Sequence, residues 1–510
     1  MKLFYMKKFL FLFVLFILTG FTVCESFDNS SAGEPGDEVW RTNSVVSLVR
    51  ARASITDAAQ FTYSDVKTLV AEAVELAGGF EGIVKYGDTV VLKPNLVTTY
   101  YNWGNTSVIP PLANGVYTDW RVVQATAELV REIIGPKGAE GSGKILVMEG
   151  SGSPGNATAT VTNFINAGYN AVNLTAVDEI IALESEGAWV GAGVASGAQA
   201  DYVTRVRLDN FRYRSAAGAY YTYYKNDGVY YVNKKMYEAD ALICIPVLKN
   251  HWHAVFTGSI KNISIGAAPP RIYGISRTNV GRNNMVNHNT ISLHEWIADY
   301  FSCIPATFTI MDGLQGLERG PLPSAANARI LANSHKNLRV ILASKDALAL
   351  DTVATNIINH NYTTVPYLVY LTERGQAGTN PNNQRVLLNG NPRNITVLGN
   401  VRVDDIRSNY AGALQSPFGA ALTNAQLAKP SLTIQSAVFA GQDLKLNLVV
   451  SSNTIKADIY IGGKYAGSVR DNLNDITIDA SKFADGAHEI TVYSYTRFMA
   501  HAAASAAAVK

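Results

Sequence analysis

The stretch that most constrains this chain is residues 239–270, where an apolar run passes abruptly into polar residues. Residues 241–248 read ALICIPVL, and the polar segments KNHWH (249–253) and TGSIKN (257–262) follow. A short run without alternation of polar and apolar residues predicts a strand that is buried on both faces of a sheet. In open α/β sheets the ligand crevice lies beyond the carboxyl ends of the strands. This junction therefore predicts a site.

The same pattern recurs at other apolar segments, and helical periodicity lies between them. Strands are predicted at 44–52, 90–92, 144–149, 171–177, 308–311 and 339–344, and helices at 63–77 (with Ser64 as N-cap), 119–134, 157–167 and 292–301. Strands that alternate with helices predict an α/β fold with a mostly parallel sheet and helices on both faces. In a parallel sheet the polar strand ends share one edge and converge on one ligand. The expected strand ends are Lys93, Glu149, Lys249, Asp312 and Asp346.

Two polar and aromatic segments interrupt this alternation. The loop 98–117 is longer than loops usually are unless they cover a site. The region 186–232 is rich in Tyr and Gly and contains DYVTRVRLD (201–209) and GVYYVNK (228–234). The region 186–232 therefore predicts an insertion or edge hairpin of short antiparallel strands that shapes one wall of the site, whereas 98–117 is a loop that either covers the site or is mobile.

The chain is too long for a single hydrophobic core, since it has 510 residues. We expect a signal peptide at 1–24, a flexible tether at 25–44, an α/β domain at 45–401, a connector at 402–430 and a β-sandwich at 431–510. The lysines before the apolar run 9–18 are typical of a secretory signal. We therefore expect the protein to be exported. It could be periplasmic, an outer-membrane lipoprotein or extracellular.

Cys24 stands where a bacterial lipoprotein carries its lipidated cysteine, which would attach the chain to a membrane. The residues before it, Phe21–Val23, lack the small residue expected directly ahead of such a cysteine. Lipidation and plain cleavage are therefore equal alternatives.

The last 80 or so residues contain short alternating strands separated by Gly, Asn and Asp turns, which predicts an all-β sandwich. This part resembles the bacterial immunoglobulin-like modules whose penultimate turn reads DGxH, here Asp485, Gly486 and His488. The resemblance implies a spacer or adhesive unit that contacts cell-surface components.

Composition excludes several classes of protein. Charged residues make up 16% of the chain and the net charge is +2, so the basic stripe of a nucleic-acid binder is missing. The three cysteines include no CxxC pair, which excludes an iron–sulfur cluster or a zinc site built on cysteines.

A glycine-rich loop follows the strand at 144–149. Gly150, Gly152 and Gly155 match GxGxxG before a helix, and Asp178 lies at the distance of a ribose-binding acid. Pro154 stiffens the loop, and this unit is not the first of the domain. A general anion site at the helix N-terminus is therefore favoured over a nucleotide-dependent oxidoreductase.

The polar residues at the strand ends suit acid–base chemistry on an anion. Lysine is a point charge for carboxylate or phosphate and also a base when buried, and histidine transfers protons near neutral pH. The reaction could also be assisted by a bound divalent metal ion. The catalytic candidates are His251, Lys249 and Asp312; the anion-binding candidates are Lys93, Asn95, Lys261, Asn262 and Thr257; the metal-binding candidates are His251, His294, Asp312 and Glu318. The alternative to a functional site is a purely structural role: the lysines would form ion pairs with Asp312 and Asp346 at the sheet edge, and the histidines would be structural residues with satisfied hydrogen bonds.

Several segments, taken together, resemble the successive motifs of the DUF362 family over residues 45–401. They are VVLKPNLV, LICIPVLKNH with TGSIKN, His294 on its helix, IMDGLQGLERGP and ASKDALALDTVA. The function of this family is unknown, so the resemblance implies a fold and a residue set but no reaction. It supports His251 over His253 as a site residue. Some relatives carry a ferredoxin-type domain, for which this chain lacks the cysteines.

Two functions from different classes therefore stand beside the oxidoreductase. The favoured one is an exported enzyme that acts on a small carboxylate or phosphate, with metal assistance as an option. The other is a non-catalytic cell-envelope protein for ligand binding or adhesion.

Overall fold

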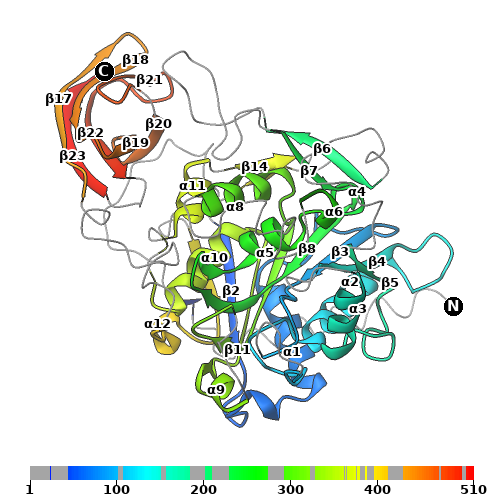
Figure 1. Cartoon of the computed structure of the whole chain (residues 1–510). Coiled ribbons are helices and arrows are strands. Elements are labelled where there is room, and N and C mark those ends of the chain that lie inside the picture. The colour runs from blue at the N-terminus through cyan, green and yellow to red at the C-terminus, as the bar shows by residue number, and fades with distance from the viewer. Residues whose placement is uncertain are drawn as a thin grey trace, which may run out of the picture.

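A computed structural model gives the fold (Figure 1). It describes residues 23–24, 44–101, 107–150, 157–183, 202–208, 229–273, 292–321, 328–360, 362, 365–374, 376–379, 385–387, 395–411, 429–469, 472–496 and 501–510. Most of the predicted signal peptide, tether and connector lies outside these residues, as do Gly152 and Gly155.

A large mixed sheet organises the first part of the chain, in the order β1-β16-β2-β13-β11-β8-β3-β4-β5, with β9, β10 and β12 attached at β11 and β9. The strands from β11 to β5 are parallel to one another, whereas β13 is antiparallel to both its neighbours. The prediction of a mostly parallel sheet is thus confirmed. The strands are β1 Val23–Cys24, β2 Ser44–Arg50, β3 Thr89–Pro94, β4 Lys144–Glu149, β5 Glu179–Ala182, β8 Ala241–Ile245, β9 Val247–His251, β10 Val255–Thr257, β11 Phe308–Leu317, β12 His335–Lys336, β13 Val340–Ser344 and β16 Ile395–Gly399.

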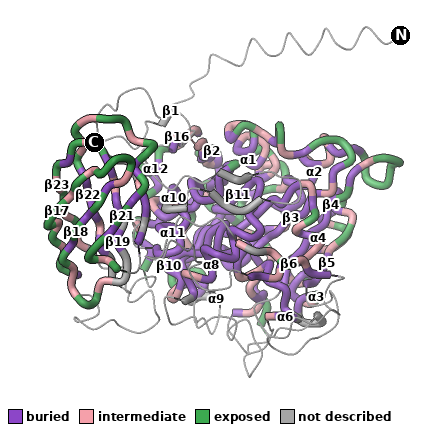
Figure 2. The backbone as a smooth tube through the Cα atoms, turned by 90° about the horizontal axis from the view of Figure 1, so that it is seen from above, coloured by how far each residue is buried: buried purple, intermediate pink, exposed green. Residues whose placement is uncertain are grey.

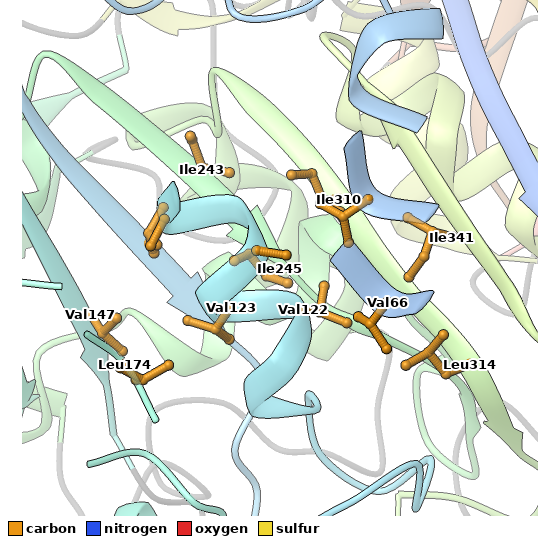
Figure 3. Packing of buried hydrophobic residues seen from close by; sticks show 14 of the residues in the cluster. Val66, Val122, Val123, Val147, Leu174, Ile243, Ile245, Ile310, Leu314 and Ile341 are labelled. Carbon is orange, nitrogen blue, oxygen red and sulfur yellow. The ribbon is translucent and has the colours of Figure 1, made fainter. Parts of the chain in front are cut away.

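Helices cover both faces of this sheet, as the sequence predicts. Val90 and Leu92 of β3 belong to the core under α1, α2 and α3, while Val91 between them belongs to the core under α5 and α8. Figure 3 shows the first core, with Val66 of α1 and Val122 of α2 packed against the sheet. The helices are α1 Tyr63–Leu76, α2 Trp120–Ile134, α3 Ala157–Asn166, α4 Lys234–Glu238, α5 Ser259–Gly266, α6 Pro270–Tyr273, α8 Ser292–Cys303, α9 Ala328–Asn333, α10 Ala347–Ile357, α11 Pro366–Arg374 and α12 Val403–Ile406, with a 3₁₀ turn at Ala58–Gln60.

Two local predictions are wrong. The N-cap of α1 is Thr62, not Ser64, because Thr62 and Asp65 form a reciprocal capping box. No strand covers 171–177; these residues form turns, and the strand is β5, which begins after Asp178. Asp178 accepts hydrogen bonds from Arg131 and from the Ile145 amide, so it anchors the sheet edge.

The C-terminal part contains two antiparallel sheets, in the orders β17-β18-β21 and β20-β19-β22-β23. Leu446 of the first sheet and Ile459 of the second belong to one buried core, an arrangement consistent with a β-sandwich. In Figure 2 the sheet and helices of the first part are mostly buried, whereas these strands carry exposed residues. The strands are β17 Leu432–Ala440, β18 Asp443–Val450, β19 Thr454–Ile461, β20 Lys464–Val469, β21 Asp475–Asp479, β22 Ala487–Thr496 and β23 His501–Val509.

Two further hairpins complete the described strands. β6 (Val203–Arg207) pairs antiparallel with β7 (Val229–Asn233), which confirms the strands expected within 186–232. β14 (Gln376–Thr379) pairs with β15 (Arg385–Leu387). Within the described ranges, no helix is long and apolar enough to cross a membrane.

Candidate functional site

The ends of β3, β4 and β9 meet helix α5 at one edge of the sheet. The residues brought together there are named the strand-end cluster: Lys93, Asn95, Glu149, Lys249, Thr257, Lys261 and Asn262. All seven side chains are buried. Polar groups gathered in the interior at strand ends are typical of a functional site.

Lys93 and Glu149 form a buried ion pair within this cluster. Lys93 Nζ lies 2.5 Å from Glu149 Oε2, and it also donates to the Pro94 carbonyl at 2.7 Å. Glu149 accepts further hydrogen bonds from the amides of Leu96 and Gly150. The prediction that the lysines pair with Asp312 and Asp346 is wrong for Lys93, because Glu149 is the carboxylate on the adjacent strand.

Asn262 joins α5 to the end of β3. Its Oδ1 accepts from Lys93 Nζ at 3.1 Å and from Asn95 Nδ2 at 3.0 Å, and its Nδ2 donates to the Pro94 carbonyl at 3.2 Å. Asn95 Oδ1 is buried and has no hydrogen-bond partner among the residues that the structure describes. Because a buried acceptor without a partner costs free energy, Asn95 Oδ1 is available to accept a hydrogen bond from a ligand.

Lys249 is buried to the same extent as Lys93 but in a different environment. Its amino group donates to the Val116 carbonyl, and within the described residues no carboxylate forms an ion pair with it. Desolvation, with repulsion by Lys261, lowers the pKa of Lys249 well below its usual value, and attraction by Glu149 only partly offsets this. Burial without a carboxylate partner therefore favours the uncharged form of the Lys249 amine.

Thr257 lies directly across the β9–β10 pair from Lys249. Residues directly opposite each other in an antiparallel pair share a face, with Cβ atoms about 4.5–5.5 Å apart. The Thr257 hydroxyl is buried and lacks a hydrogen-bond partner among the described residues. The side chains of Lys249 and Thr257 therefore leave this strand pair on the same face.

The two histidines of KNHWH do not lie on the same strand. β9 ends at His251, and His253 lies in the following turn, with the ring centroids 5.9 Å apart. His251 Nδ1 accepts the amides of His253 and Ala254, both at 3.1 Å. An accepting Nδ1 leaves the proton of the neutral ring on Nε2, so His251 is held as a hydrogen-bond donor.

His253 belongs at the border of the strand-end cluster, although the sequence favours only His251. Burial and repulsion by Lys261 lower the pKa of His253. Lys261 thus influences both His253 and Lys249, which places three ionisable cationic side chains in one neighbourhood. In the sequence, the only indication that His253 belongs to the site is its position two residues after His251.

Asp312 holds the start of α2 instead of facing the cluster. Its Oδ2 accepts the Asp119 amide at 2.9 Å and its Oδ1 accepts the Leu314 amide at 3.0 Å. Desolvation, reinforced by the Asp119 carboxylate, raises the pKa of Asp312 to about 7. Since both oxygens are used by backbone amides, the predicted catalytic role of Asp312 is not supported.

The predicted metal ligands do not form one site. Glu318 pairs with Lys336 at 3.0 Å and accepts the Ala411 amide at 2.8 Å, while the His294 ring stacks on Tyr367 with centroids 5.7 Å apart. In the part of the chain that the structure describes, no three His, Cys, Asp or Glu side chains are grouped to hold a metal ion. Each predicted ligand instead has a packing or hydrogen-bonding role in its own region.

Asp346 is also absent from the cluster, contrary to the convergence expected of five strand ends. β13 runs antiparallel to β11, so Ser344 at the end of β13 pairs with Thr309 near the start of β11. Asp346 therefore lies toward the opposite edge of the sheet, where it caps α10 and accepts from the Ser44 hydroxyl at 2.6 Å.

Asp351 of α10 is a site-supporting residue that the sequence did not single out. Helix α5 begins after Gly258, which provides no side-chain cap. Asp351 Oδ1 accepts the Ser259 amide and hydroxyl at 2.8 Å, and its Oδ2 accepts the Ile260 amide at 3.1 Å. Asp351 thus caps α5 from another helix and fixes the turn that carries Lys261 and Asn262. Its position four residues after the α10 N-terminus gave no sign of this contact.

We expect Asp351→Ala to loosen α5 and to lower the free energy of unfolding by about 1–3 kcal/mol, because buried amides lose their acceptor. Hydrogen exchange measured by mass spectrometry should show faster exchange at residues 259–263. Asp346→Ala is the matched control, since it removes the cap of α10 but keeps Asp351, which accepts the amides of Ser259 and Ile260. Unchanged exchange in α5 of Asp351→Ala would contradict this role.

The glycine-rich loop is described only at its start. The Gly150 amide donates to Glu149 Oε1 at 2.7 Å, so the first amide of the loop already has an anionic partner within the protein. A pyrophosphate approaching this amide would meet the Glu149 carboxylate, which disfavours the nucleotide prediction. Gly152 and Gly155 lie outside the described residues.

The segment before α2 closes over the strand ends, in agreement with the expected covering loop. Besides the Val116 contact with Lys249, the Thr118 hydroxyl donates to the Ile245 carbonyl at 2.6 Å and accepts the Asn95 amide at 2.9 Å. The loop is therefore attached to β8, to β9 and to the residue after β3 by hydrogen bonds that each join a side chain to a backbone group.

Comparisons with known proteins give one family and several distant structures. The lactate racemase apoprotein from Thermoanaerobacterium thermosaccharolyticum is 12% identical with a TM-score of 0.30, and the match covers 71% of this chain and 64% of that one. The spore cortex lytic enzyme SleM of Clostridium perfringens is 17% identical with a TM-score of 0.16, over 17% of this chain and 31% of that one. Fibronectin(III)-like modules of CbhA from Clostridium thermocellum are 19% identical with a TM-score of 0.14, over 16% of this chain and 94% of that one.

These identities and TM-scores are too low to support an assignment of fold or function. No curated protein matches the sequence. A protein-family model matches residues 90–356, which make up more than half of the chain. The chain belongs to this family, described as "Domain of unknown function (DUF362)".

Proposed function

We propose that the α/β domain is an enzyme that binds a small carboxylate or phosphate at the strand-end cluster and acts on it by acid–base chemistry. The observation that carries the proposal is the fully buried Lys249, whose amino group donates to the Val116 carbonyl and which lies near Lys261. Burial and, to a lesser extent, Lys261 lower the pKa of both Lys249 and His253. The nearby carboxylate of Glu149 is already committed to Lys93. A bound anion would be attracted by the positive charge of Lys261.

The roles differ from those that the sequence predicts. Lys249 is the proton acceptor, because a neutral amine can take a proton, and Lys261 supplies charge for the anion. His251 donates through Nε2. Lys93 and Asn262 hold α5 and β3 together and support the site from behind.

A thermal-shift titration with inorganic phosphate and with simple carboxylates tests the anion site. We expect at least one anion to stabilise the wild type, with a gain of about 2.7 kcal/mol at a hundred times its Kd. The gain should be lost in Lys261→Ala and kept in Lys445→Ala, an exposed lysine of the C-terminal strand β18. Equal stabilisation of all three proteins would contradict the site.

We also propose that the protein is exported and that its C-terminal part is an immunoglobulin-like module that contacts the cell surface. The apolar N-terminal segment and the DGxH turn support this. Cell fractionation with radiolabelled palmitate tests it: a labelled wild type and an unlabelled Cys24→Ser variant indicate a lipoprotein. An unlabelled exported wild type indicates simple cleavage, and a protein retained in the cytoplasm would contradict export.

A non-catalytic ligand-binding role remains the second candidate function of the protein, because the C-terminal sheets suit attachment to the cell envelope.

A further inference from the structure

Two lysines of the strand-end cluster are equally buried but have opposite electrostatic surroundings. Lys93 donates to the Glu149 carboxylate at 2.5 Å, whereas Lys249 donates to a neutral carbonyl, that of Val116. Both side chains are 0% exposed. The different partners imply different protonation states.

A buried ammonium group needs a counter-charge, because removing an ion from water costs several kcal/mol even after the protein relaxes. Lys93 has that counter-charge in Glu149. Lys249 instead lies close to Lys261, whose charge disfavours a second ammonium group. An amine that gives one hydrogen to Val116 keeps its lone pair, so Lys249 is a competent nucleophile.

Two groups beside Lys249 suit a particular electrophile. The Thr257 side chain leaves the β9–β10 pair on the same face as the Lys249 side chain, and its buried hydroxyl has no hydrogen-bond partner among the described residues, so it is available to donate to an oxygen of a ligand. Lys261 supplies a positive charge close by for an anionic substituent. A carbonyl next to a carboxylate combines both requirements in one small molecule.

We propose that Lys249 forms a Schiff base with a carbonyl compound that carries a carboxylate, the class of 2-oxo acids. This inference rests on the proposed anion site and names its substrate class. The Lys249 lone pair attacks the carbonyl carbon, a C–N bond forms, and the carbonyl electron pair moves to oxygen. The oxygen takes up the two amine hydrogens and leaves as water when the C–O bond breaks, which gives the imine. Thr257 donates a hydrogen bond to this oxygen, and Lys261 binds the carboxylate.

Borohydride trapping tests the proposal on the full-length protein. Wild-type protein is incubated with pyruvate or glyoxylate and sodium borohydride, digested and mapped by mass spectrometry. We expect one reduced adduct at Lys249, no adduct there in Lys249→Arg, and normal trapping in Lys445→Arg. Lys261→Ala should raise the pyruvate concentration for half-maximal trapping about tenfold, equivalent to ~1.4 kcal/mol of binding. Circular dichroism establishes that each variant is folded.

The outcomes separate this inference from the proposed function. Adducts spread over surface lysines, with no preference for Lys249, would overturn the Schiff base. If phosphate or acetate still stabilises the wild type but not Lys261→Ala in that case, the anion site stands alone. Inorganic phosphate should also compete with pyruvate in the wild type, a test that needs no variant. Trapping at Lys249 that phosphate leaves unchanged would contradict the shared site.

Discussion

Replacing Lys93 by methionine is expected to lower the free energy of unfolding by about 3–5 kcal/mol, the usual cost of removing one partner from a buried ion pair. The Glu149 carboxylate would stay buried without its lysine partner, although the amides of Leu96 and Gly150 would still donate to it. Lys93→Met also removes the contact to Asn262, so α5 would lose part of its attachment to β3. Urea denaturation measures the loss.

A double-mutant cycle isolates the pair. Lys93→Met with Glu149→Gln removes both charges, so the double variant should be more stable than the sum of the two single losses predicts. The coupling should also be insensitive to salt, because neither group contacts solvent. Additive losses, or a loss below ~1 kcal/mol for Lys93→Met, would show that Lys93 and Glu149 are not a buried pair.

Replacing Lys249 by methionine should have a very different effect, although the two lysines are equally buried. At pH 9 the unfolding free energy should change by less than ~1 kcal/mol, because the lost hydrogen bond to Val116 is offset by relief from burying an amine. At lower pH the variant should be more stable than the wild type. The unfolded wild type binds a proton at Lys249 that the folded state does not bind, and this stabilises the unfolded state.

The sign follows from the lowered pKa of Lys249. Between that pKa and the ordinary lysine value of 10.5, the unfolded chain holds more protons, so wild-type stability rises with pH. From pH 6 to pH 9 the unfolding free energy of the wild type should therefore rise relative to that of Lys249→Met. A difference that does not vary with pH would mean that the folded protein binds the Lys249 proton as well as the unfolded chain does.

Much of the sheet could be predicted from the sequence, because the buried strands are short apolar runs with sharp polar ends. β4 has the predicted bounds 144–149, and α2 follows Asp119 as expected. The direction of β13 could not be predicted, since an apolar run has the same appearance whichever way it lies in the sheet. Asp346 was therefore placed at the wrong edge.

The sequence does not predict the alanine-rich strand β23 either. Alanine has a low preference for strands, so residues 501–509 carry no local strand signal. Pairing with β22 along its whole length determines the conformation of this segment. Tertiary contacts decide the structure here.

The membership of the site was predictable in part. Lys93, Asn95, Lys249, Thr257, Lys261 and Asn262 do come together, because they follow adjacent strands or lie on the helix after them. Which lysine has a carboxylate partner depends on the neighbouring strand, and the sequence alone does not give strand order. The role of Asp351 depends in the same way on how α10 packs against α5.

The most direct test of this account is the protonation state of Lys249, measured by NMR on protein with ¹³C-labelled lysine ε-carbons. The Lys249 signal is assigned as the one missing from Lys249→Arg, and its chemical shift is followed with pH. We predict that it titrates well below 10.5, as a neutral amine near physiological pH. A Lys249 signal that keeps the charged form up to the ordinary lysine value would contradict both the proton-acceptor role and the Schiff base.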